Sequence, residues 1–128
     1  MAKITYIILL DDSKSMVYIM DWAITKYNKL ISDLKVSVDD VYVTTVLFSR
    51  RIKILLDNVR VADVPELRDY EVDDMTAYND MVYKILDEMT ADKYVIISDK
   101  IENYSTVKSK AETDAKIATK DVTYVGQT

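Results

Sequence analysis

An apolar run from Ile4 to Leu10 ends directly in the polar sequence Asp11-Asp12-Ser13-Lys14-Ser15. Such a run is typical of a buried strand, and open α/β sheets carry their functional sites at the carboxyl ends of their strands. Asp11, Ser13 and Ser15 offer only hard oxygen donors, which suit Mg²⁺ better than zinc or copper. The alternative is that these residues merely stop the strand and cap the helix that follows.

Composition limits both the size of the fold and its chemistry. The 128-residue chain is expected to form a single domain, residues 1–128. It contains no cysteine and no histidine, which excludes disulfides, thiol nucleophiles, zinc-thiolate sites and imidazole bases. A net charge of −5 argues against nucleic-acid binding, because phosphate contacts need a basic face. The first apolar run is too short to span a membrane and has no cleavage site after it. We therefore expect no membrane association and a cytoplasmic location, in the host cytoplasm if a phage encodes the chain.

The rest of the sequence predicts alternating strands and helices. Apolar residues recur at three- and four-residue steps over residues 15–34, which predicts an amphipathic helix. Runs 41–48 and 52–56 are separated by too few residues for a parallel crossover, so a hairpin is expected. A long loop, a helix, a short strand, a helix and a last strand follow at 57–74, 78–89, 94–98, 106–120 and 122–125, with Pro65 able to open a short helix inside the loop. This order predicts an α/β fold, a three-layer Rossmann-like sandwich with a mainly parallel sheet, one antiparallel edge strand and helices on both faces.

Two further oxygen donors are predicted to reach the edge that carries Asp11. Asp99 directly follows strand 94–98, and Thr76 lies just before the helix that begins near residue 78. If the first strand and strand 94–98 are neighbours, Asp11 and Asp99 end side by side, with Thr76 approaching from the loop. Capping explains each residue separately, but it does not explain why they share one edge.

In this set of oxygen donors the chain resembles the von Willebrand factor type A (vWA) domain with its metal-ion-dependent adhesion site (MIDAS), in its small microbial or phage form. The matching motifs are D-x-S-x-S at 11–15, the threonine before the second helix and the aspartate after a buried strand, and the resemblance extends over nearly the whole chain. It implies a Mg²⁺ or Mn²⁺ ion held by Asp11, Ser13, Ser15, Thr76 and Asp99. The chain departs from the family pattern at Met75 and Lys100, where glycine is usual.

The resemblance implies a metal-dependent protein–protein interaction module that is not an enzyme. Neutral hydroxyls with at most two carboxylates would leave a divalent ion positively charged and with an open position, which an Asp or Glu of a protein partner can fill. Tyr70, Asp74 and Tyr104 flank the predicted site and are expected to contact that partner. The last strand, 122–125, would leave an open sheet edge, so self-association through it is also expected.

A phospho-acceptor receiver domain is the alternative of a different class. Asp11-Asp12 also resembles the acidic pair of a receiver, and Asp57 resembles its phosphorylated aspartate. A receiver, however, has a helix between its second and third strands, and the gap between residues 48 and 52 cannot hold one.

Overall fold

The central strand of the protein is β1 (Lys3–Asp11), which lies in the middle of a five-stranded sheet of order β3-β2-β1-β4-β5. The computed structural model describes residues 3–49, 51–72, 77–98 and 109–126. β1 pairs in parallel with β2 (Asp40–Phe48) and with β4 (Lys93–Ser98), and β5 (Val122–Gly126) pairs in parallel with β4. The predicted neighbourhood of the first strand and the strand at 94–98 is therefore confirmed.

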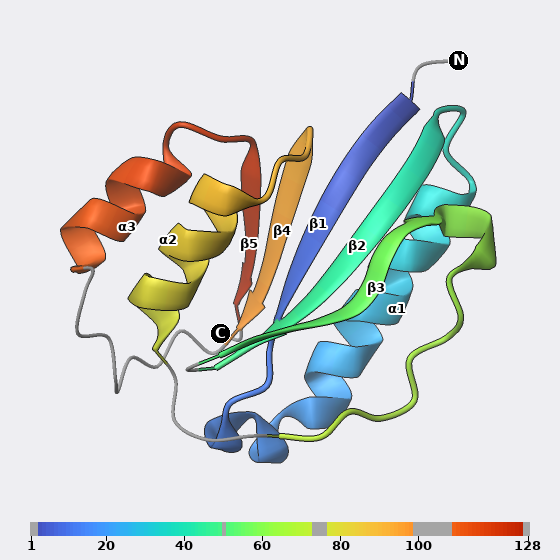
Figure 1. Ribbon diagram of the computed structural model, residues 1–128. Helices are drawn as coiled ribbons and strands as arrows, with labels where there is room; N and C mark the ends of the chain where they lie inside the picture. The colour runs from blue at the N-terminus through green and yellow to red at the C-terminus, as the bar shows by residue number, and fades with distance from the viewer. Residues whose placement is uncertain (1–2, 50, 73–76, 99–108, 127–128) are drawn as a thin grey trace.

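Helices cover the two faces of this sheet (Figure 1). α1 (Met20–Lys35) lies on one face, and α2 (Tyr78–Glu88) and α3 (Lys110–Ile117) lie on the other. Ile8 and Leu10 belong to the apolar cluster beneath α1, together with Tyr27, whereas Ile7 and Leu9 belong to the cluster beneath α2. Alternate residues of β1 thus point into two cores, which explains why the whole run is apolar. The predicted three-layer α/β sandwich is confirmed.

The predicted hairpin is present, but its second strand is longer than expected. β3 (Ile52–Arg60) runs antiparallel to β2 and forms the edge of the sheet. The register shifts on either side of Thr45, and Asn58 adopts a positive φ of 53° while its N–H donates to Thr44 Oγ1 at 2.9 Å. Asparagine tolerates this left-handed conformation better than most residues, so the strand continues through a bulge where the polar sequence predicted its end.

Three other features of the helices differ from the prediction. The helix expected at 15–34 is divided at Ile19 into a 3₁₀ helix, η1 (Lys14–Tyr18), and α1. Within the described part of the loop no helix begins at Pro65, and a short 3₁₀ helix, η2 (Val61–Asp63), precedes it instead. α3 begins at Lys110 because Ser109 and Glu112 form a reciprocal capping box. No helix in the described ranges is both long and apolar enough to cross a membrane.

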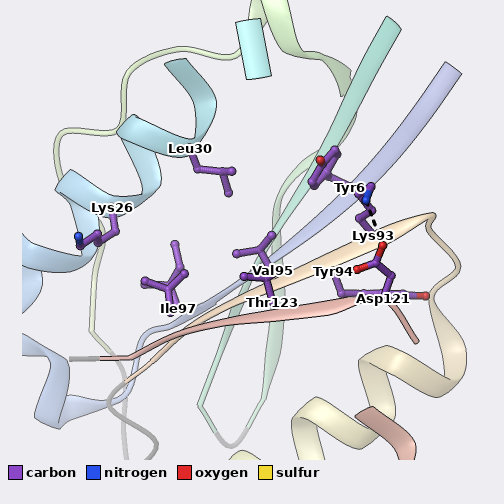
Figure 2. Close-up of a pocket in the computed structure, with 10 residues that line it drawn as sticks. Tyr6, Lys26, Leu30, Lys93, Tyr94, Val95, Ile97, Asp121 and Thr123 are labelled. Atoms are coloured by element: carbon purple, nitrogen blue, oxygen red, sulfur yellow. Dashed lines mark hydrogen bonds and ion pairs between the residues drawn. The ribbon is translucent and has the colours of Figure 1, made fainter. Parts of the chain in front are cut away.

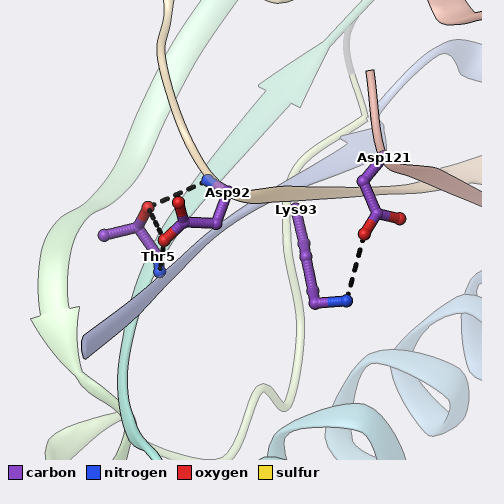
Figure 3. Close-up of polar contacts among 4 residues, drawn as sticks. All are labelled: Thr5, Asp92, Lys93 and Asp121. Atoms are coloured by element: carbon purple, nitrogen blue, oxygen red, sulfur yellow. Dashed lines mark hydrogen bonds and ion pairs between the residues drawn. The ribbon is translucent and has the colours of Figure 1, made fainter. Parts of the chain in front are cut away.

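The end of the sheet opposite Asp11 is tied by polar contacts (Figure 3). The Asp92 carboxylate accepts hydrogen bonds from the backbone N–H of Thr5 at 2.9 Å and from its hydroxyl at 3.1 Å. These bonds hold the pKa of Asp92 below its ordinary value, because they favour the charged carboxylate. Lys93 and Asp121 form an ion pair at 3.0 Å between the starts of β4 and β5. These contacts join β1 and the start of β5 to the start of β4.

Candidate metal centre

Asp11, the last residue of β1, is held at three of its oxygen atoms. Its side chain is fully buried, with 0% exposed. Oδ1 accepts the Ser13 backbone N–H at 2.8 Å, and Oδ2 accepts the Ser98 hydroxyl at 2.6 Å. The Asp11 backbone carbonyl accepts the Tyr70 hydroxyl at 3.2 Å. A buried carboxylate needs such partners, since burying an uncompensated charge is costly. The carboxylate thus joins the end of β4 to the loop after β1.

The two serines of the motif bring their hydroxyls together. Ser13 Oγ lies 3.2 Å from Ser15 Oγ, and Ser13 is buried. Although Ser13 stands at the cap position of η1, its side chain makes no capping hydrogen bond. Neighbouring ligands of an octahedral Mg²⁺ with bonds of roughly 2.0–2.1 Å are about 3 Å apart. The spacing of the hydroxyl pair fits two such ligands, and helix capping does not account for Ser13.

Thr76 and Asp99, the other two predicted ligands, lie outside the described residues, but their neighbours lie at this edge. Ala77 donates its N–H to the Ser49 carbonyl at 2.9 Å, and Ser49 directly follows β2. Ser98, the residue before Asp99, donates its hydroxyl to Asp11 as described above. Three chain segments, after β1, before α2 and at the end of β4, therefore meet at the carboxyl edge of the sheet.

Tyr70, predicted to contact a partner, has a different position. The ring is buried, with 7% exposed, and its hydroxyl bonds to the Asp11 carbonyl. We correct its expected role accordingly: Tyr70 supports the end of β1 from within the protein and offers a partner little surface. Asp74 and Tyr104, the other predicted partner contacts, lie outside the described residues. A loop has no hydrophobic periodicity from which the burial of a tyrosine could be predicted. Tyr70 was therefore expected to be exposed.

The exposed side chains beside the serine pair belong to η1. Tyr18 is 89% exposed and Val17 is 50% exposed, three and two residues after Ser15. Both lie outside the apolar stripe of the predicted helix, and this position could have predicted their exposure from the sequence. An exposed aromatic next to a site is a common anchor for protein partners.

Two consecutive buried carboxylates, those of Asp11 and Asp12, lie at this edge. Asp12 is buried beside Asp11, and its backbone N–H donates to the Phe48 carbonyl at 2.9 Å. Burial raises the pKa of Tyr78 beneath the site, and the neighbouring Tyr124, Asp114 and Asp11 raise it further. Tyr78 therefore stays neutral and cannot serve as a base at ordinary pH.

In the part of the chain that the structure describes, no three Asp, Glu, His or Cys side chains gather as metal ligands. The available donors are mainly hydroxyls.

Asp57 does not share this site, which rules out the geometry of a receiver domain. It lies exposed in β3 next to Leu56, which pairs with Thr45, whereas Asp11 pairs with Phe48. Three to four residues of strand separate the two positions, which is roughly 10–13 Å at about 3.3 Å per residue. The antiparallel hairpin also leaves no helix between β2 and β3. The receiver alternative is therefore wrong.

Solved structures share this arrangement of strands and helices. VWA2, an ArnB paralog from Sulfolobus acidocaldarius, superposes with a TM-score of 0.69 at 19% identity, covering 98% of this chain and 34% of that one. A von Willebrand factor type A protein from Catenulispora acidiphila gives 0.56 at 14% identity, covering 96% and 32%. This chain has the vWA fold. Proximal thread matrix protein 1 from the mussel byssus, with a zinc-occupied MIDAS motif, gives 0.60 at 14% identity, covering 98% and 37%.

These vWA structures are longer than the chain described here, which spans about a third of each of them. No protein-family model matches the sequence. No curated protein matches it either.

Within the vWA fold, Ser98 and Ser49 are site residues that the sequence reasoning missed. Both are fully buried, and they hold Asp11 and the start of α2 respectively. For Ser98 the available signal was a hydroxyl residue at the carboxyl end of a buried strand, whereas Ser49 contacts Ala77 through its backbone carbonyl, which residue type does not reveal.

Proposed function

We propose that this vWA-fold chain is a protein interaction module that binds a partner's Asp or Glu through Mg²⁺ or Mn²⁺. The observation that carries the proposal is the pair of hydroxyls of Ser13 and Ser15, 3.2 Å apart beside the clamped Asp11 carboxylate. Thr76 and Asp99 would complete the set from the two segments that reach the same edge. The zinc-occupied MIDAS of the mussel protein supports a divalent ion at this place in the fold.

The donor chemistry favours binding over catalysis. Three of the five donors are neutral hydroxyls, so the ion would be neutralised by no more than the carboxylates of Asp11 and Asp99. An open coordination position on it could then take a carboxylate from outside the chain. A catalytic role would need a positioned base or an activated nucleophile, and the sequence has neither histidine nor cysteine. We therefore propose a non-enzymatic module with a protein partner, without nucleic-acid or membrane contacts, in the cytoplasm.

Calorimetric titration with Mg²⁺ and with Mn²⁺ tests the metal site. We expect one ion per chain, and Ser13→Ala should weaken its binding at least about tenfold because it removes one donor of the pair. Ser32→Ala, an exposed serine on α1, is the matched control and should bind like the parent. Equal affinities for the parent and Ser13→Ala would rule out the serine pair as ligands.

We also propose that the chain associates with itself through β5. β5 is the outermost strand of the sheet, and Thr123 and Tyr124 in it are exposed. A groove between α1 and the edge formed by β4 and β5 adds a little apolar surface from the partly exposed Leu30 and Val125, while Val95 and Ile97 at its base are buried (Figure 2). An open edge beside apolar surface invites pairing with another strand.

Light scattering across micromolar concentrations tests this association. The parent should show a dimer whose population rises with concentration, and Thr123→Lys should shift it to monomer by placing like charges at the edge. Thr25→Lys, on the exposed surface of α1, adds the same charge elsewhere and should leave the dimer intact. A parent that stays monomeric throughout the range would contradict the proposal.

A further inference from the structure

The single glycine of the chain, Gly126, lies beneath the ring of Tyr124. A Cβ at Gly126 would lie 2.5 Å from Tyr124 Cε1, far inside van der Waals contact. Only glycine therefore allows the ring to lie over the end of β5. From there the Tyr124 hydroxyl donates to the Ser98 carbonyl at 2.9 Å. The contact fixes the last residue of β4, immediately before Asp99.

From Ser98 a series of hydrogen bonds continues to the serine pair. The Ser98 hydroxyl donates to Asp11 Oδ2 at 2.6 Å, and Asp11 Oδ1 accepts the Ser13 N–H at 2.8 Å. Ser13 Oγ then lies 3.2 Å from Ser15 Oγ. The series joins β5, β4, β1 and the loop before η1 without a gap. A displacement at Tyr124 is therefore passed to the hydroxyls through contacts of ordinary hydrogen-bond length.

We propose that Tyr124 is a positioning residue for the D-x-S-x-S loop, and that Gly126 is glycine because the Tyr124 ring requires it. The expected effect on metal affinity rests on the proposed function, because the D-x-S-x-S loop is the candidate metal site. Residues that orient metal ligands from outside typically change metal affinity by about 10–100-fold. Tyr124 would act in this way through Ser98 and Asp11, without touching the ion.

Amide hydrogen exchange of the metal-free protein tests the positioning directly. In Tyr124→Phe, which removes only the hydroxyl, we expect the Ser13 amide to exchange roughly three- to tenfold faster, as the loss of one hydrogen bond in the series allows. The Asp12 amide, which bonds to Phe48 in β2, lies outside the series and should keep its rate. Tyr42→Phe, on β2 near the opposite end of the sheet, is the control variant and should change neither amide. An unchanged Ser13 rate in Tyr124→Phe would overturn the proposal.

Titration with Mn²⁺ adds a readout that a purely structural role of Tyr124 would not change. Tyr124→Phe should bind Mn²⁺ about tenfold more weakly than the parent. Gly126→Ala should cause a similar loss, and the double variant should lose little more, because both changes break the same contact. If the parent binds Mn²⁺ and Tyr124→Phe binds it equally, the proposal is wrong. If the parent binds no Mn²⁺ while Tyr124→Phe still speeds exchange at Ser13, the positioning stands and the proposed function fails.

Discussion

Replacing Asp11 by alanine is expected to abolish measurable Mg²⁺ binding and to lower the free energy of unfolding of the metal-free protein by about 2 kcal/mol. The change leaves two buried donors, the Ser13 N–H and the Ser98 hydroxyl, without the acceptor they have now. Each orphaned donor costs about 1–3 kcal/mol. The loss of unfolding free energy should lie near the lower end of the summed cost of the two donors. Removing one of two adjacent buried carboxylates also removes its desolvation penalty, which offsets part of that cost.

Urea unfolding in the presence of a chelator measures this stability change. Asp33→Ala is the matched control, because Asp33 is exposed and its ion pair with Lys29 at 3.1 Å lies on the surface. The control should change stability by no more than about 0.5 kcal/mol. Asp11→Asn should fall between the parent and alanine, since its remaining carbonyl can accept one of the two hydrogen bonds. An alanine variant as stable as the parent would show that Asp11 does not organise the loop.

Removal of the metal is expected to reduce partner affinity by about 30- to several-thousand-fold. A partner carboxylate that contacts the ion at a desolvated centre makes a charged contact worth about 2–5 kcal/mol, and this contact is lost with the ion. The exposed Tyr18 and Val17 beside the serine pair would retain some contact area, so weak binding should survive chelation.

Capture of partners from the native host lysate, with and without a chelator, measures this effect. Capture of the partner should fall strongly with chelator, recover with Mg²⁺ or Mn²⁺, and also fall with Thr76→Ala. Thr25→Ala, on the outer surface of α1, should capture it like the parent. Recovery of the same partner under all conditions would mean that binding occurs on another surface and does not need the ion.

The sheet could be predicted from the sequence because its signals are local. Residues Ile7 to Leu10 before Asp11 are apolar on both faces, as a central parallel strand requires, and the short gap after Phe48 permits only a hairpin. The same reasoning placed Asp11 and the end of β4 side by side, which the bond from Ser98 bears out.

The features that the sequence did not reveal depend on contacts between distant residues. The division of the first helix at Ile19 separates η1 from α1, although the apolar spacing continues across it. The burial of Tyr70 depends on how residues 64–72 run along α1, where Leu67 bonds to Asn28, before the Tyr70 hydroxyl reaches the end of β1, and no local pattern encodes that path. The role of Gly126 likewise appears only once the Tyr124 ring lies above it.

Paramagnetic broadening by Mn²⁺ in an amide NMR spectrum is the most direct test of an ion at the carboxyl edge of the sheet. We predict that substoichiometric Mn²⁺ broadens the amides of Ser13, Ser15 and Ser98 first, and that excess Mg²⁺ restores them. Val36 and Val38, in the loop before β2 at the opposite end of the sheet, should stay sharp. Broadening that is absent, uniform or centred on the two valines would contradict a metal site formed by the D-x-S-x-S loop.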